Sequence, residues 1–299
     1  MRTLYDEPLS AHTTMRVGGP ADRMVFVSSE EELREILISC RDEGTPCTVI
    51  GKGSNLLVSD AGYRGTVIST ADVLTGTEIL GEEEESVLIG AKSGVVLMAL
   101  SVFAAEQGLS GLEFASGIPG TVGGAVRMNA GAYGGEMRDV TAEVTLLGRD
   151  GTVRCVSGEE MRFSYRHSIL TETGEIVLSA RFRLRRGDRT VIRRTMDELL
   201  EKRRSKQPLE YPSAGSTWKR PEGYFAAKLI EEAGCKGLSV GDAQISEKHA
   251  GFLINKGHAT AAQIRSLMRE VERRVYENSG VRLTPEVEML GEWEEVTES

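Results

Sequence analysis

The most informative part of this 299-residue chain is a run of small residues, Ala115-Ser-Gly-Ile-Pro-Gly-Thr-Val-Gly-Gly-Ala-Val-Arg-Met-Asn-Ala-Gly-Ala-Tyr-Gly-Gly135. Seven of its twenty-one residues are glycine, and three more are Ala125, Ala130 and Ala132. Glycine at this density loses much conformational entropy on folding, which is expected where another group must approach the backbone closely. A flexible linker is the alternative, but linkers lack the Val, Ile and Met present here. The run therefore favours a loop that cradles an extended, flat, negatively charged ligand.

A second glycine loop, Gly51-Lys-Gly-Ser-Asn-Leu-Leu57, follows a short apolar run, Cys47-Thr-Val-Ile50. Before it, a capping-box pattern at Ser29 and apolar residues at helical spacing as far as Gly44 predict a helix, which the strand and the glycine turn follow. The loop matches neither the Walker pattern nor GxGxxG, because Leu56 stands where the third glycine belongs. Its backbone N–H groups can still bind a diphosphate, and Ser54 and Asn55 add side-chain donors. Two such loops suit a long dinucleotide such as FAD.

Composition excludes several classes of protein. A net charge of −9 argues against nucleic acid as a partner. The chain has no run of eighteen apolar residues and no apolar signal segment at its start, so we expect neither a membrane partner nor secretion. The four cysteines and four histidines are dispersed, without a CxxC pair, which predicts no metal site. These observations favour a reduced, cytoplasmic enzyme or binding protein.

The remaining periodicities predict alternating helices and strands. Glu82 to Glu85 is expected to form a solvated turn, and Asp150-Gly151 the turn of a hairpin. The other elements we expect are a buried helix over 95–106, a strand over 175–185 and amphipathic helices over 225–234 and 260–278.

Residues 181–206 hold eleven Arg or Lys against four acids. A cationic helix that links two domains is the interpretation we favour, and a phosphate site is the alternative. Because the pattern changes near residue 195, residues 195–299 are predicted to form a separate α/β domain.

Three polar segments are candidates for chemistry. In Ser213-Ala-Gly-Ser-Thr-Trp-Lys-Arg-Pro221, Ser216 lies close to Lys219 and Arg220. A hydroxyl in a cationic pocket can protonate a carbanion, but a serine-containing turn before a helix explains the segment equally well. Tyr165-Arg-His-Ser168 and Thr284-Pro-Glu286 also carry charged groups, although a lone Arg or Glu is usually a surface charge. Spacing alone does not connect Arg166 or Glu286 with Ser216.

Taken together, these motifs resemble the UDP-N-acetylenolpyruvoylglucosamine reductase (MurB) family of peptidoglycan synthesis. The resemblance runs nearly from end to end, and its specificity comes from the order of the motifs. The matching segments are 13–21, 51–58, 116–124, 129–131, 165–168, 213–219, 247–252 and 285–287. The resemblance implies an FAD-binding fold of the vanillyl-alcohol-oxidase type with a C-terminal α/β substrate-binding domain. The expected boundaries are 1–70 and 71–194 for two FAD-binding subdomains and 195–299 for the substrate-binding domain.

The resemblance also implies a reaction, UDP-N-acetylmuramate dehydrogenase activity. NADPH reduces the flavin, and the hydride then passes to C3 of the enolpyruvyl ether of UDP-N-acetylenolpyruvoylglucosamine. By matched position, Ser216 protonates C2 of the enolate, while Arg166 and Glu286 polarise the carboxylate and stabilise its developing charge. Such delocalisation needs a cation and preorganised donors away from water. Tyr165, Lys219 and His249 are expected to contact the substrate.

We expect FAD to be held without a covalent bond by the two glycine loops. A side chain introduced at Gly123 is expected to enter the cofactor's space. The expected cofactor-binding residues are Gly51, Gly53, Ser54, Asn55, Leu56, Ser116, Gly117, Pro119, Gly120, Gly123, Gly124, Asn129 and Gly131. The chain resembles the shorter form of the family, which lacks the loop that folds a tyrosine over the substrate, and Arg220 stands where some relatives have Asn.

Two other functions stay open. A different flavin-dependent oxidase or dehydrogenase on the same fold would act on an alcohol or lactone and would not need Ser216, Arg166 and Glu286. A nucleotide-sugar or FAD-binding regulatory protein would bind flavin without turnover. Substrate turnover and bleaching of the flavin by NADPH distinguish these functions.

Overall fold

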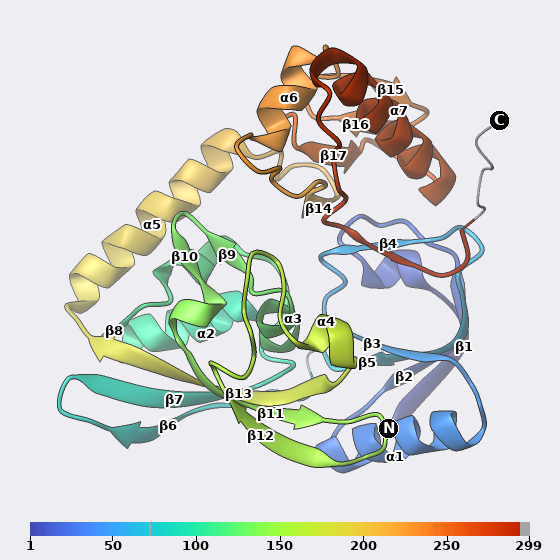
Figure 1. Cartoon of the computed structure of the whole chain (residues 1–299). Helices are drawn as coiled ribbons and strands as arrows, with labels where there is room; N and C mark the ends of the chain where they lie inside the picture. The colour runs from blue at the N-terminus through green and yellow to red at the C-terminus, as the bar shows by residue number, and fades with distance from the viewer. Residues whose placement is uncertain (72, 294–299) are drawn as a thin grey trace. The chain divides into compact units, whose positions relative to one another are not determined.

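The computed structural model describes residues 1–71 and 73–293 (Figure 1). The chain divides into two compact units, one formed by residues 1–3, 24–52 and 66–203, the other by 4–23, 53–65 and 204 onwards. Each unit contains its own hydrophobic core. The expected boundary at 195 falls inside helix α5 (Arg189–Lys206), and the three expected domains stay a prediction.

A six-stranded antiparallel sheet is the frame of the first unit. Strands β12 (Val153–Ser157), β11 (Thr141–Leu147), β13 (Ile176–Arg186), β7 (Ser86–Lys92) and β6 (Thr77–Glu82) lie in that order, and β8 (Leu109–Ser110) pairs with β13. These pairings confirm the predicted hairpin around Asp150-Gly151, the strand near 175–185 and the acidic turn.

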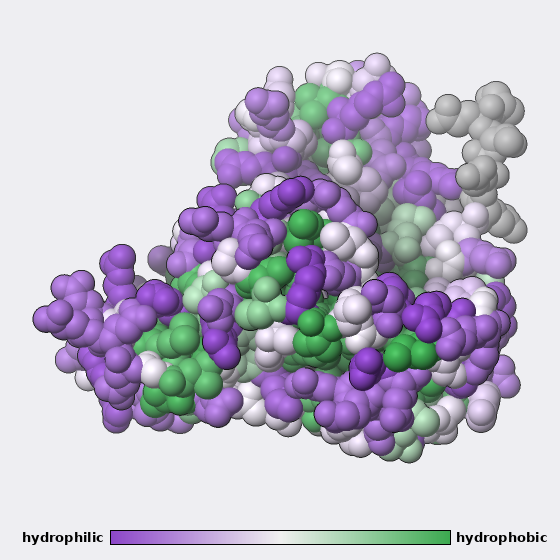
Figure 2. All heavy atoms as spheres, turned by 60° about the horizontal axis from the view of Figure 1, so that its bottom comes forward, coloured by the Kyte–Doolittle hydropathy of each residue, from purple (hydrophilic) through white to green (hydrophobic). Residues whose placement is uncertain are grey.

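Strand β13 shows why this sheet has a covered and a charged face. Ala180, Phe182 and Leu184 are buried in the core, whereas the alternate residues Arg181 and Arg183 are exposed. This alternation follows from the two-residue period of a strand. The two arginines form ion pairs at 2.7 Å with glutamates of neighbouring segments. Figure 2 shows a mostly hydrophilic surface with scattered hydrophobic groups.

Helices cover the apolar face of the sheet. Helix α2 (Leu97–Glu106) and helix α3 (Val122–Arg127) contribute to the core there, and α4 (Leu170–Thr173) precedes β13 (Figure 1). The first residues of α5 continue this packing, because Ile192 and Met196 form a small cluster with Ala105 of α2. The helix predicted over 95–106 is confirmed as α2.

The N-terminal α/β segment forms as its sequence predicts. Helix α1 (Glu30–Asp42) begins after Ser29, whose hydroxyl accepts a hydrogen bond from Glu32 N at 3.2 Å, and Gly44 follows it in the left-handed region (φ +66°). Strand β3 (Cys47–Ile50) pairs in parallel with β5 (Tyr63–Ser69) in a sheet of order β1-β2-β5-β3, where β1 is Arg2–Pro8 and β2 is Pro20–Phe26.

The second unit has a four-stranded antiparallel sheet and two main helices. Its strands are β14 (Ser213–Ser216), β17 (Phe252–Asn255), β16 (Ala243–Ile245) and β15 (Ser239–Val240), in that order. Helix α6 is Ala226–Glu232 and helix α7 is Ala261–Ser279; both were predicted. The apolar stripe of α7 is fully buried, and the carboxylate of Asp60 accepts hydrogen bonds at 2.8 Å from the first two amides of this helix. A parallel pair of β4 (Leu56–Val58) and β18 (Glu288–Leu290) completes the unit.

Within residues 1–71 and 73–293, no helix has both the length and the apolar character that a membrane span requires. The same residues contain no group of three or more His, Cys, Asp or Glu side chains placed to hold a metal ion.

Candidate active site

The glycine-rich run of the first unit is ordered structure. It contains a 3-10 helix, η2 (Glu113–Gly117), then α3, and then a small hairpin of β9 (Gly131–Ala132) and β10 (Gly135–Glu136). Backbone hydrogen bonds join it to the start of α2, from Leu97 N to Gly120 O at 3.0 Å and from Val122 N to Val95 O at 2.9 Å. These contacts rule out the linker interpretation.

The glycines of this unit serve different purposes. A Cβ on Gly51 would collide with the side chain of Thr121, and one on Gly131 would lie 2.6 Å from Glu136 Cβ, so these glycines permit close backbone packing. A Cβ on Gly124 would meet only Thr121 Oγ1, at 3.8 Å. The chain thus leaves space beside Gly124. Space beside an exposed backbone is what a flat cofactor requires, and in this respect the run fits FAD.

Gly123 packs closely against the protein, and its expected contact with the cofactor stays a prediction. Its amide donates to Ser93 O at 2.9 Å, and a Cβ built on it would lie 3.0 Å from Ser93 Cβ. A side chain at Gly123 therefore crowds Ser93. Gly124, its neighbour in α3, has more open space beside it.

Two predicted cofactor residues turn their side chains toward the protein. The buried Ser116 hydroxyl donates to Glu113 O at 2.9 Å. The fully buried amide of Asn129 donates to Glu136 Oε2 at 3.0 Å and to Ser164 O at 2.9 Å, and its oxygen accepts from the Arg138 amide at 2.9 Å. Asn129 also has a φ of +43°, which asparagine tolerates better than most residues. The side chains of Ser116 and Asn129 therefore fix the conformation of the glycine-rich run.

Arg166 lies beside the glycine-rich run. Reciprocal backbone hydrogen bonds of 3.1 Å between Ser164 and His167 form a tight turn, and Arg166 within it has a φ of +54°. Its guanidinium donates to Gly131 O at 3.0 Å and lies 5.0 Å from the ring centre of Tyr165, which is itself exposed. Arg166 and Tyr165, two predicted site residues, therefore lie together beside Gly131, which was predicted to bind the cofactor.

In the second unit, the other glycine loop supports the segment that contains Glu286. Asn55 donates through its side chain to Glu286 O at 3.0 Å, and its own carbonyl accepts from Glu288 N at 2.8 Å. Leu56 then pairs with Glu288 in the parallel β4–β18 register. Gly53 has a φ of +59°, and a Cβ there would collide with His12 O. Asn55 and Leu56 were predicted to bind the cofactor. The contacts that the structure shows for them support the backbone of the segment that contains Glu286.

The backbone that follows Ser216 pairs with the backbone around Glu286. Strand β14 ends at Ser216, and the following residues pair antiparallel with the segment before β18: Glu286 N donates to Thr217 O at 2.8 Å, and Lys219 N donates to Thr284 O at 2.8 Å. Trp218 and Pro285 form the bridge between these two bonds. Ser216 is exposed. The structure therefore joins the segments that contain two predicted catalytic residues, which spacing could not connect.

Comparison with known proteins places these features in a family. The family model for the UDP-N-acetylenolpyruvoylglucosamine reductase C-terminal domain matches residues 207–290, and the FAD binding domain model matches residues 21–157. A reductase of that name from Agathobacter rectalis is 52% identical, with 97% of this chain and 94% of the relative covered. The corresponding proteins of Lachnoclostridium phytofermentans and Clostridioides difficile are each 47% identical, with coverage of 97% and 96% of this chain and 94% and 93% of the relative.

The chain belongs to the UDP-N-acetylenolpyruvoylglucosamine reductase family.

A solved structure of this reductase from Thermus caldophilus supports the fold assignment. It superposes with a TM-score of 0.81 at 38% identity and covers 97% of this chain and 98% of its own. The predicted fold class, an FAD-binding fold followed by a C-terminal domain of this reductase family, is confirmed. FAD is the cofactor that the matched domain binds.

His249 is held as a neutral ring in this reductase. Burial lowers its pKa below the usual 6.5. Nδ1 accepts a hydrogen bond from Gly251 N at 3.2 Å, which leaves the proton on Nε2. The ring packs edge-on against Phe252 at 5.0 Å. Such a group is a hydrogen-bond donor without a charge. Lys219, partly buried on the segment paired with Thr284, is the nearest cation in sequence to Ser216.

Sequence reasoning missed the support beneath Ser216. Trp218 is 2% exposed, and its indole N–H donates to Glu272 of α7 at 3.0 Å. The buried hydroxyl of Thr217 accepts from Leu253 N at 3.1 Å. The sequence does contain one indication of this support, the tryptophan within the polar segment Ser213–Pro221. A large aromatic side chain there is expected to be buried in a hydrophobic core.

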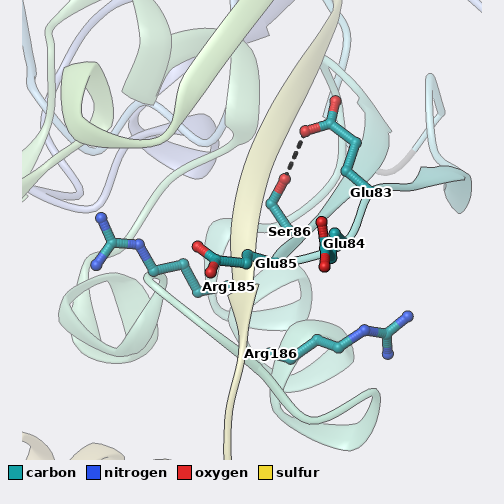
Figure 3. A pocket seen from close by; sticks show the side chains of 6 residues that line it. All are labelled: Glu83, Glu84, Glu85, Ser86, Arg185 and Arg186. Carbon is teal, nitrogen blue, oxygen red and sulfur yellow. Dashed lines mark hydrogen bonds between the residues drawn. The ribbon is translucent and has the colours of Figure 1, made fainter.

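A separate hollow of about 840 Å³ lies at the β6–β7 turn and the end of β13. Glu83, Glu84, Glu85, Ser86, Arg185 and Arg186 line it, and none of them was predicted as a site residue (Figure 3). Arg186 already pairs with Glu82, Glu83 accepts from Ser86 at 2.7 Å, and the two arginines point in different directions. Two of its charged residues, Glu83 and Arg186, therefore already have partners in the protein.

Proposed function

We propose that this chain reduces UDP-N-acetylenolpyruvoylglucosamine to UDP-N-acetylmuramate, with NADPH as the electron donor. The observation that carries the proposal is the pairing of Thr217 and Lys219 with Glu286 and Thr284, because it joins the segment that contains Ser216 to the segment that contains Glu286. Membership of the reductase family supports the substrate class. The cytoplasmic location and the boundaries 1–70, 71–194 and 195–299 belong to the same proposal.

Bound FAD would supply the hydride that reaches C3 of the enolpyruvyl group after NADPH has reduced the cofactor. The residues proposed to hold it are the backbone of Gly117, Pro119, Gly120, Gly123, Gly124 and Gly131 in one loop and that of Gly51, Gly53 and Ser54 in the other. The space beside Gly124 supports this role. Ser116, Asn129, Asn55 and Leu56 act mainly by shaping these loops, because their recorded contacts are with the protein.

Ser216 is proposed to donate the proton that C2 receives. Its exposure at the end of β14 leaves the hydroxyl accessible to a substrate, and the paired backbone on both sides fixes its position. A positioned general acid typically contributes a factor of about 100 to 10,000 to the rate. The turn-forming role that sequence reasoning left open is not needed, because Ser216 lies at the end of a strand.

Arg166 and Glu286 are proposed to stabilise the charge that develops on the substrate carboxylate. A guanidinium is a permanent cation, and Gly131 O holds Arg166 in place at 3.0 Å. A carboxylate beside the developing anion repels it unless the carboxylate is protonated or a cation bridges the two groups. Glu286 therefore needs a proton or a bridging cation in the substrate complex. Tyr165, Lys219 and the neutral His249 are proposed to contact the nucleotide sugar.

An anaerobic visible spectrum tests the whole proposal. Flavin bands that bleach with NADPH and return only on addition of the enolpyruvyl UDP-sugar are the expected result. Bleaching without recovery by this sugar would favour another flavin oxidoreductase of the same fold. Flavin that NADPH does not bleach would favour a binding protein without turnover.

A further inference from the structure

Thr14 connects the second glycine loop with the strand that leads to Ser216. Its backbone N–H donates to Gly53 O at 3.3 Å, and its hydroxyl donates to Ser213 O at 2.7 Å. Ser213 is the first residue of β14, and Ser216 is the last. All four residues belong to the second unit. Thr14 therefore contacts both a loop expected to bind the cofactor and the strand that carries the proposed proton donor.

Close packing holds Thr14 in this place. A Cβ on Gly53 would collide with His12 O, so the segment that contains Thr14 lies directly against the bare backbone of the loop. The next residue, Met15, is 2% exposed and belongs to the hydrophobic core that also contains Ala214 of β14. The segment is thus anchored on both sides, by the loop and by the core beneath β14.

Strand β14 depends on such anchors because its own pairing is irregular. It lies at one edge of its sheet, and its register with β17 shifts between Ser213 and Ser216. Between these residues Gly215 has a φ of +78°. An irregular pairing of this kind bends a strand and redirects its side chains. The neighbouring strand β17 also supports the anchor, because the buried side chain of Asn255 donates to Met15 O at 3.2 Å.

We propose that Thr14 is a positioning residue for the proton transfer, whose hydroxyl fixes β14, and through it Ser216, relative to the loop at Gly53. A proton donor has to lie within hydrogen-bond reach of the atom that it protonates. A displacement of about 1 Å can lower a rate roughly a hundredfold. The inference rests on the proposed role of Ser216 and goes beyond it, because it assigns control of this step to a residue that acts through the backbone.

Stopped-flow measurements on the holoenzyme test the inference. Thr14→Val removes the hydroxyl at nearly constant size. Thr195→Val is the matched control, because the Thr195 hydroxyl also donates to a backbone carbonyl, that of Val191, at 3.0 Å. In Thr14→Val we expect reoxidation of the flavin by the enolpyruvyl UDP-sugar to slow about five- to a hundredfold, while reduction by NADPH and the Kd for FAD change less than twofold. Thr195→Val is expected to change none of these, and Thr14→Ser, which keeps the hydroxyl, to restore most of the rate.

A double variant shows whether Thr14 acts through Ser216. In a Ser216→Ala background, Thr14→Val is expected to slow the second half-reaction less than twofold further, because the donor that it positions is already absent. Amide hydrogen exchange of residues 213–217 in the flavin-free protein supplies a readout without turnover. This exchange is expected to become faster in Thr14→Val and to stay unchanged in Thr195→Val.

Three results would overturn the inference. One is an unchanged second half-reaction in folded Thr14→Val when Ser216→Ala slows it, and another is full additivity in the double variant. The third is an equal loss in both half-reactions with weaker FAD binding, which would assign Thr14 to the loop alone. A normal second half-reaction in Ser216→Ala would instead refute the proposed role of Ser216, and this inference with it. If Thr14→Val does not fold, Thr14→Cys, which keeps a weaker donor, serves as the test with an intermediate expected rate.

Discussion

Replacing Gly124 by alanine is expected to stabilise the flavin-free protein and to weaken its binding of FAD. The two effects separate because the protein itself has room for the added methyl group: its Cβ would meet only Thr121 Oγ1, at 3.8 Å. Gly124 lies within helix α3, where its φ is not positive, so alanine fits the backbone without strain. Any loss of affinity then reports on the space that a ligand occupies.

The magnitudes follow from this geometry. A compatible Gly-to-Ala change stabilises a protein by about 0.4–1 kcal/mol, chiefly by restricting the unfolded chain. For a unit of this size, that corresponds to a rise of roughly 1–4 °C in the midpoint of apoprotein unfolding. A methyl group forced into a filled contact costs about 1–3 kcal/mol, which raises the Kd for FAD by roughly 5- to 150-fold.

The assay pairs thermal unfolding of apoprotein with a fluorescence titration of FAD. Gly123→Ala is the matched control, because its Cβ would lie 3.0 Å from Ser93 Cβ and so destabilise the apoprotein itself. An unchanged FAD affinity in Gly124→Ala would show that the run does not cradle the cofactor. A fall in the unfolding midpoint equal to that of Gly123→Ala would show that the space beside Gly124 is absent.

Three further changes test other parts of the site. Ser216→Ala is expected to leave flavin reduction by NADPH near wild type and to slow the second half-reaction roughly a hundredfold or more in stopped-flow measurements; equal losses in both halves would remove Ser216 from the role of proton donor. Asn129→Asp places a second carboxylate beside Glu136 and removes the donor to Ser164 O, so we expect a loss of about 1–3 kcal/mol at pH 7 in denaturant unfolding that acid partly restores, against no measurable change for the exposed Asn278→Asp. Because burial lowers the pKa of His249, the unfolded chain binds its proton more readily, and stability should fall as the pH drops below 6.5 toward the lowered pKa. His249→Gln should remove this part of the pH dependence of the unfolding midpoint and the exposed His258→Gln should not; identical profiles for both variants would contradict the assignment.

Local elements were predictable because their signals lie within a few residues of one another. Ser29 and Gly44 bound α1, and the apolar residues of α7 recur at helical spacing, so backbone hydrogen bonding and side-chain direction follow from nearby sequence. The glycine-rich run and the order of the motifs similarly determined the family and its cofactor.

Tertiary structure decided which segments meet. Ser216 and Glu286 lie seventy residues apart in the sequence, and the Thr217–Glu286 backbone bond joins the segments that contain them; nothing in the spacing predicts that register. The direction of Gly123 toward Ser93, and of its neighbour Gly124 into open space, depends on the rotation of α3 against its surroundings. The side chains of Asn129 and Asn55, both expected to bind the cofactor, bond to segments of the protein that the sequence does not identify.

The sequence by itself thus determined the elements, the family and the types of residue in the site, since each of these depends on local pattern. Only the tertiary structure decided which polar groups bond to other parts of the chain, as the side chains of Asn129 and Asn55 do, because a side chain's hydrogen bonds and burial depend on segments remote in sequence.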